Sequence, residues 1–218
     1  TTFIHPEIRD QYIAVNWHSI YEMVESRYLV VRNHFDRLLS CYYANVVHTS
    51  LQNKNTAKYY GHRGTFEDFI RGVPKLLDVI IEKARTGEIE NVPTWHFAPY
   101  GLMLHVGNMP QEIASSWLVV DASQYHSLID YLISKGAMIN PDDVRKRIDT
   151  ITNLEYTKDF SLGTRNLHEV DFLEWREVKQ KPTYDLMYTE EMIEIVKDCY
   201  AEDFKLFPRI MKFNRGEK

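Results

Sequence analysis

Residues 28–43 read Tyr-Leu-Val-Val-Arg-Asn-His-Phe-Asp-Arg-Leu-Leu-Ser-Cys-Tyr-Tyr. The apolar run at 28–31 predicts a strand that ends at Arg32, and the spacing of the apolar residues after it predicts a helix over 35–48. Ser40 lies on that helix, eight residues after Arg32. A guanidinium at the carboxyl end of a strand, next to a helical hydroxyl, is a corner that can hold a phosphate, because arginine offers a planar fork of donors.

A second amphipathic pattern lies at 188–207 and predicts a single core helix. Thr189 is a suitable N-cap, and the two glutamates that follow it favour the positive end of the helix dipole. Pro208 ends the helix. The positions predicted to face the core are Met192, Ile195, Val196, Cys199, Tyr200, Asp203, Phe204 and Phe207.

The remaining chain alternates short apolar runs with amphipathic stretches, which predicts an α/β domain with a parallel sheet flanked by helices. Strands are expected at 12–16 and 116–120, and helices at 20–25, 66–87, 100–106, 124–135 and 141–150. Thr65 caps the helix at 66–87, and Pro74 is expected to restart it. The polar, aperiodic segment 153–185 is too long for a structureless loop, so it is expected to be a functional cover or to carry a short helix.

The two patterns resemble the sulfotransferases that use 3′-phosphoadenosine 5′-phosphosulfate (PAPS), in particular the family of the chondroitin, dermatan and heparan 2-O-sulfotransferases and their bacterial relatives. That family reads V-R-[DNH]-P-[FI]-[ED]-R-L-[LV]-S-x-Y at the first stretch, and His34 stands here in place of its proline. Its closing helix reads Y-[ST]-E-E-x-x-x-x-V-x-x-x-Y-x-x-D-F-x-x-F. The resemblance implies a P-loop-kinase-like three-layer fold, with 1–218 as one domain. It also implies PAPS as co-substrate, no metal, and Arg32 and Ser40 as ligands of the 3′-phosphate.

Sulfuryl transfer needs a base for the acceptor proton, and histidine is suited to that role. His18 is the first candidate, because heparan 2-O-sulfotransferases similarly place a catalytic histidine before the phosphate-binding strand. His96 is the alternative, in a segment that resembles the family's H-[WF]-x-P-Q. Arg165, near His168, matches a nucleotide-covering loop with basic residues and is predicted to bind the cofactor. Arg37 is predicted to stabilise the helix, whereas Arg32 binds ligand.

The family's 5′-phosphosulfate loop, K-[TV]-G-[GC]-[TS]-[TS], is not found in the sequence, and no lysine precedes Lys54. Thr1 and Thr2 could be the end of such a loop, or residues 3–6 could be a degenerate form of the strand that introduces it. Two hypotheses stay open: a sulfotransferase acting on a hydroxyl, with a small-molecule or glycan acceptor, and a degenerate relative that binds adenosine bisphosphate or glycan without catalysis. A P-loop kinase is disfavoured, because its G-x-x-x-x-G-K-[ST] motif is missing.

The composition of the chain limits its size class, its partners and its cellular location. A 218-residue chain with 44% hydrophobic residues is large enough for one folded core. The net charge of −5 argues against a nucleic-acid partner. Two cysteines, Cys41 and Cys199, are expected to be free thiols, and the sequence has no glycosylation sequon and no predicted membrane segment. These features favour a cytoplasmic protein of bacterial or viral origin. A Golgi-lumen domain of a longer protein is the alternative, and a homo-oligomer stays open.

Overall fold

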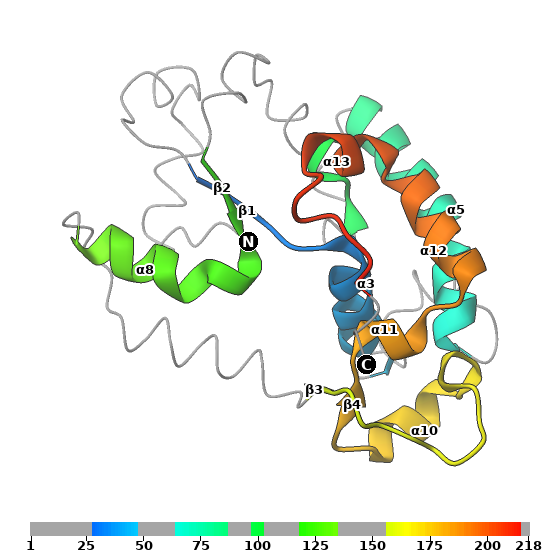
Figure 1. Ribbon diagram of the computed structural model, residues 1–218. Coiled ribbons are helices and arrows are strands. Elements are labelled where there is room, and N and C mark those ends of the chain that lie inside the picture. The colour runs from blue at the N-terminus through cyan, green and yellow to red at the C-terminus, as the bar shows by residue number, and fades with distance from the viewer. Residues whose placement is uncertain (1–27, 48–63, 87–96, 103–117, 135–155, 215–218) are drawn as a thin grey trace, which may run out of the picture.

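The computed structural model describes residues 28–47, 64–86, 97–102, 118–134 and 156–214. This part of the chain combines helices with short parallel strands (Figure 1), which is compatible with the predicted α/β class. The strands are β1 (Tyr28–Val31), β2 (Leu118–Asp121), β3 (Tyr156–Thr157) and β4 (Lys181–Pro182). The helices are α3 (His34–Tyr42), α5 (Phe66–Thr86), α8 (Tyr125–Ser134), α10 (Phe172–Glu177), α11 (Tyr184–Met187), α12 (Glu190–Cys199) and α13 (Ala201–Leu206).

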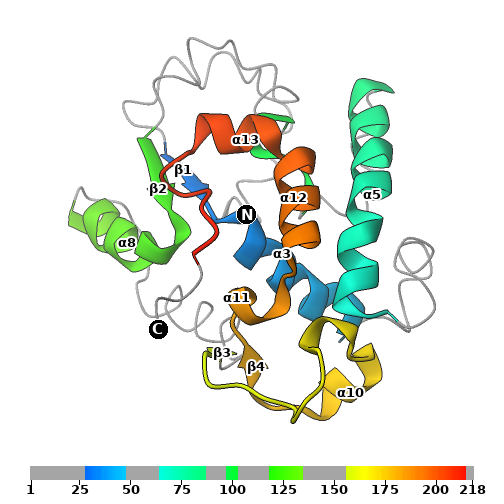
Figure 2. The same ribbon diagram turned by 45° about the vertical axis from the view of Figure 1, so that its right-hand side comes forward.

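Strands β1 and β2 pair in parallel, with Tyr28 opposite Leu118 and Val31 opposite Asp121. The carboxyl ends of both strands therefore lie at the same edge, where Arg32 leaves β1. Helix α8 follows β2 and lies on the side of this strand pair away from α5 and α12 (Figures 1 and 2). The strands predicted around 28–31 and 116–120 are confirmed, and the edge at which a ligand is expected carries the predicted arginine.

Asn33 caps the N-terminus of α3, and its side chain accepts a hydrogen bond of 2.9 Å from the backbone N–H of Phe35. The helix continues into a π-helical turn, Tyr43–Val47. The apolar residues whose spacing predicted this helix all lie in the core: Leu38, Leu39, Tyr42, Val46 and Val47.

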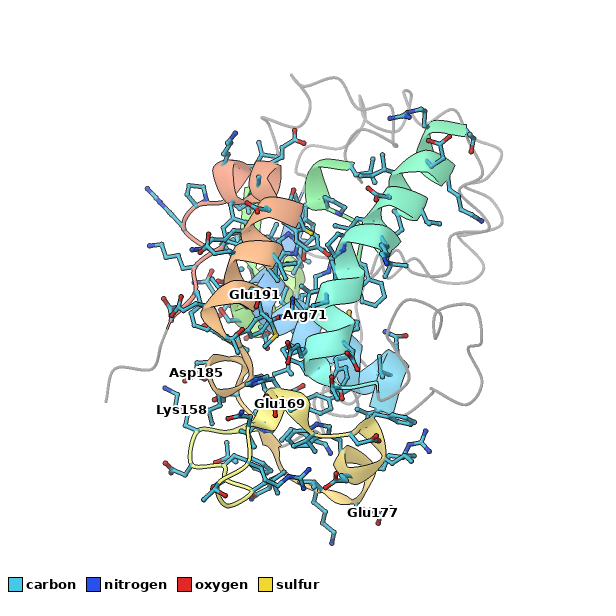
Figure 3. The ribbon with its side chains drawn as sticks, turned by 90° about the vertical axis from the view of Figure 1, so that its right-hand side faces the viewer. Arg71, Lys158, Glu169, Glu177, Asp185 and Glu191 are labelled. Carbon is cyan, nitrogen blue, oxygen red and sulfur yellow. The ribbon has the colours of Figure 1, made fainter. Side chains whose placement is uncertain are left out.

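Helices α3, α5 and α12 pack together around an aromatic-rich core, with α5 and α12 side by side (Figures 1 and 2). On the surface, Arg71 of α5 donates to both carboxylate oxygens of Glu191 on α12, at 2.7 and 2.8 Å (Figure 3). Helix α5 runs without interruption through Pro74, so the predicted restart is wrong. Its apolar residues on both sides of the proline enter the same core, which compensates for the lost backbone hydrogen bond.

The closing segment is two helices and not the single helix that was predicted. Tyr200, with φ −119° and ψ 27°, separates α12 from α13. Its ring is buried, and its hydroxyl donates to the carbonyl of Phe97 at 2.8 Å. Thr189 caps α12 as predicted, accepting from Met192 N at 3.3 Å. Tertiary contacts of the tyrosine therefore prevail over the local helical pattern.

The segment 156–187 carries short helices, as predicted for the long polar stretch. Both predicted free thiols are found as such. Among the described helices, none combines the length and apolar character needed to cross a bilayer.

Candidate functional site

Arg32 occupies the carboxyl end of β1, as the sequence predicts. Its backbone N–H donates to the hydroxyl of Tyr100 at 2.9 Å. Its Nε donates to Oδ2 of Asp36 at 2.5 Å, and the two side chains are 37% and 36% exposed. Burial, the largest single effect, lowers the pKa of Arg32. The hydrogen bond and the charge of Asp36 raise it, and together with smaller contributions they prevail, so the pKa lies above its ordinary value. The corner therefore holds a partly exposed, permanent positive charge.

Ser40 reaches the same corner from α3. Its side chain lies close enough to the phenol of Tyr156 to lower the pKa of that group, and so does the charge of Arg32. Burial above all, and then the charge of Asp36, raises the pKa of Tyr156 to about 12, although Arg32 and Ser40 lower it. The structure thus brings together the two predicted ligands of the 3′-phosphate and adds a neutral hydroxyl donor.

Tyr156 was missed by sequence reasoning. It belongs to the polar segment that was predicted to be a functional cover or to carry a short helix, but no periodicity distinguished it from its neighbours. Its position depends on the pairing of β3 with β4, in which Tyr156 lies opposite Lys181. Lys181 is buried and donates through Nζ to the carbonyls of Trp175, in the last turn of α10, and of Val178, which caps that helix. This buried ammonium closes the segment into a compact unit and so fixes the tyrosine.

A pocket of about 360 Å³ adjoins the corner. It is lined by Asp36, Tyr156, Lys158, Thr183, Tyr184, Asp185 and Asn214. Asp36 and Tyr156 thus belong both to the charged corner and to the pocket wall. Lys158 and Asp185 come from different segments and lie near each other in Figure 3. Phenol rings beside carboxylate, amide and hydroxyl groups are suited to a hydroxyl-rich ligand that carries hydrogen-bond donors and acceptors.

Arg37 points to a different part of the structure. Its Nη1 donates to the carbonyl of Ala98 at 3.0 Å, and its guanidinium lies 4.7 Å from the ring centroid of Tyr100. These contacts fit the predicted role of holding the helix. Asp36, which precedes Arg37 in the sequence, bonds to Arg32.

His34, which replaces the proline of the family pattern, is fully buried against Asp203 of α13. Its Nε2 lies 2.7 Å from Oδ2 of Asp203, and its ring stacks on Tyr200 with a centroid distance of 3.9 Å. Asp203 also accepts the backbone N–H groups of Tyr100 and Gly101, at 2.6 and 2.8 Å. Burial above all lowers the pKa of His34 to about 4, so the imidazole is neutral near neutral pH.

The network around Asp203 connects three parts of the chain that lie far apart in the sequence. It binds the start of α3 to α13 and to the segment at 97–102, whose Tyr100 contacts the backbone of Arg32. Tyr188, before α12, adds a hydrogen bond of 3.1 Å to the carbonyl of Phe35. The two stretches that carry the family resemblance are therefore in direct contact.

Arg165 lies on the surface, where its two terminal nitrogens donate to Glu174 at 2.6 and 3.0 Å. None of its described contacts joins it to Arg32 or Ser40. The candidate bases His18 and His96 lie outside the described residues.

Within the described ranges, Glu67, His168 and Glu169 offer ligand atoms that lie within 4.8 Å of one another and could hold a cation. Glu67, however, accepts a hydrogen bond of 2.9 Å from Nε of Arg71. The guanidinium already compensates its charge, which weakens the case for a metal there.

Searches against protein-family models, curated proteins and solved structures found no match to this chain.

Proposed function

We propose that this chain is a PAPS-dependent sulfotransferase that transfers a sulfuryl group to a hydroxyl, in the first instance of a carbohydrate. The observation that carries the proposal is the corner at the end of β1. There a charged arginine and the hydroxyls of Ser40 and Tyr156 lie together beside a polar pocket. This set of donors suits a phosphate monoester, since charge-assisted hydrogen bonds from arginine are strong and hydroxyls satisfy the remaining oxygens.

The contact between the two family-like stretches supports the same proposal. The phosphate-binding helix of the proposed fold needs a fixed position relative to the sheet edge. His34, Phe35 and Arg37 each bond to a remote segment, so α3 is held at its first turn from several directions. We take the parallel pair β1–β2 as part of a P-loop-kinase-like sheet, with Arg32 at its ligand-binding edge.

In the proposed reaction, a histidine accepts the proton of the acceptor hydroxyl. The acceptor oxygen forms a bond to sulfur while the bond from sulfur to the 5′-phosphate oxygen breaks, and that oxygen keeps the electron pair. The products are a sulfate ester and 3′-phosphoadenosine 5′-phosphate (PAP). His18 and His96 are the candidate bases, and alanine replacement of the true base should lower turnover by about a hundredfold with little change in nucleotide affinity.

A relative that binds adenosine bisphosphate without catalysis is the second candidate. The observation that favours it is the missing K-[TV]-G-[GC]-[TS]-[TS] motif, whose lysine and backbone amides would hold the sulfate and 5′-phosphate. Both candidates use the corner at Arg32 in the same way. They differ in whether sulfuryl transfer follows binding.

Calorimetric titration with PAP and with 5′-AMP tests the shared part of the proposal, because the two nucleotides differ by the 3′-phosphate. We expect PAP to bind about 10- to 100-fold more tightly, the scale of a charge-assisted contact. Arg32→Ala should remove most of that difference. Arg71→Ala, which breaks an exposed ion pair on α5, should preserve it. Equal binding of PAP and 5′-AMP by the parent protein would refute both candidates.

Release of PAP from PAPS in the presence of glycan acceptors then separates the two. An enzyme produces PAP together with a sulfated acceptor, whereas the binding protein retains PAPS unchanged.

A further inference from the structure

The guanidinium of Arg32 has two edges, and the structure gives them different surroundings. The Nε edge donates to Asp36 at 2.5 Å. Within the described part of the chain, Asp36 is the single hydrogen-bond partner of the Arg32 side chain. The terminal nitrogens Nη1 and Nη2 thus form a fork that no described residue occupies.

Asp36 itself is held in place. It lies in the first turn of α3, four residues after Arg32, where Asn33 caps the helix. The amide of Asn33 also donates to the carbonyl of Ile210 at 2.9 Å. The next residue, Arg37, is bonded to the carbonyl of Ala98. The carboxylate therefore projects from a fixed turn, and its bond to Nε restricts the rotation of a long side chain.

We propose, on the basis of the proposed function, that Asp36 is a positioning residue for the 3′-phosphate. It binds the Nε edge of Arg32 and so directs the Nη1–Nη2 edge towards the phosphate that Ser40 also contacts. The phosphate then receives two parallel N–H donors from a guanidinium whose orientation is set before binding. An arginine that is already ordered loses less conformational freedom when the ligand arrives, which increases affinity.

The opposite role makes a different prediction. If Asp36 were an internal anion that the phosphate displaces, removing its charge would tighten binding whatever replaced it. The geometry favours the positioning role, because one carboxylate oxygen of Asp36 accepts the hydrogen bond from Nε and leaves the terminal nitrogens of Arg32 open. The ion pair contributes little to folding, since both side chains are more than a third exposed. Variants at Asp36 are therefore expected to fold.

The test measures the dissociation constant of 5′-AMP divided by that of PAP, a ratio that isolates recognition of the 3′-phosphate and is higher when PAP is preferred. The ratio is compared between the parent protein, Asp36→Ala and Asp36→Asn. Asp36→Ala frees the guanidinium and should lower the ratio about tenfold, the scale of immobilising one arginine side chain. Asp36→Asn keeps an oxygen acceptor for Nε without the charge. Its ratio should therefore stay within about twofold of the parent value or rise.

Glu67→Ala is the matched control, because Glu67 accepts Nε of Arg71 in an equivalent pair four residues apart on α5. It should leave the ratio unchanged. A ratio for Asp36→Ala equal to or above that of the parent overturns the positioning role, and so does an Asp36→Asn ratio as low as that of Asp36→Ala. If Arg32→Ala abolishes the preference for PAP while Asp36→Ala preserves it, the inference alone fails. A parent protein without that preference overturns the proposed function as well.

Discussion

Asp203 offers the sharpest test of how the fold is held together. Its carboxylate is fully buried and accepts three hydrogen bonds, from Tyr100 N at 2.6 Å, His34 Nε2 at 2.7 Å and Gly101 N at 2.8 Å. The first two reach Oδ2 and the third reaches Oδ1. Asp203→Asn keeps the shape of the side chain but replaces one acceptor oxygen by an NH₂ donor and removes the charge.

The cost follows from these contacts. With the amide oxygen in the Oδ2 position, the NH₂ group faces the N–H of Gly101, which leaves a buried donor unpaired at a cost of about 1–3 kcal/mol. The other two hydrogen bonds change from charge-assisted to neutral, at about 1 kcal/mol each. We therefore expect Asp203→Asn to lower the free energy of unfolding by about 3–5 kcal/mol. For a chain of this size, each kcal/mol corresponds to about 2–4 °C in Tm.

Urea denaturation followed by circular dichroism, with calorimetry for Tm, measures this change. Asp198→Asn is the control, because Asp198 is an exposed aspartate on α12. It should stay within about 0.5 kcal/mol of the parent. If Asp203→Asn were as stable as the control, Asp203 could not be the shared acceptor that joins α13 to α3.

Three further predictions concern the same region. Because the folded pKa of His34 is about 4 and the unfolded value about 6.5, unfolding takes up a proton between these values. The contribution of His34 to the free energy of unfolding is therefore fully present above about pH 6.5, and it falls by about 1.4 kcal/mol per pH unit as the pH decreases towards 4. Urea denaturation at several pH values should find this slope reduced in His34→Gln. Arg37→Lys should lower Tm, because lysine cannot reproduce both the bond to Ala98 and the stacking on Tyr100, and it should leave the dissociation constant for PAP unchanged. A stable variant that binds PAP weakly would reverse the roles of Arg32 and Arg37. Tyr156→Phe removes one hydroxyl and should weaken the binding of PAP, but not of 5′-AMP, by about three- to tenfold in calorimetry. Equal loss of affinity for both nucleotides would contradict a contact between Tyr156 and the 3′-phosphate.

The parts of the fold that follow local patterns could be predicted from the sequence. The strand at 28–31 has the predicted bounds, and the inner face of α3 is buried as its spacing indicates. Apolar periodicity reports which side of an element meets the core, so it succeeds for such segments. The break at Tyr200 was missed because it depends on the stacking of that ring on His34 and on the hydrogen bond of its hydroxyl to the carbonyl of Phe97, which no local pattern contains.

The residues of the candidate site also differ in whether a local sequence pattern could identify them. Arg32 and Ser40 belong to one strand–helix unit, and a motif of known spacing was enough to place them together. Tyr156 comes from a segment that is remote in sequence, and its position depends on the pairing with Lys181. The role of His34 was also hidden, because the pattern marked it as a substitution for proline while its partner, Asp203, lies 169 residues away. Pairings of this kind become visible once the tertiary structure is known.

The structure of the complex with PAP shows directly whether Arg32 and Ser40 bind the 3′-phosphate. We predict that the 3′-phosphate lies about 2.7–3.0 Å from a terminal nitrogen of Arg32 and from the hydroxyl of Ser40. Asp36 should still accept the Nε of Arg32 in that complex. A nucleotide bound elsewhere, or a 3′-phosphate held by other residues while Arg32 faces solvent, would contradict it.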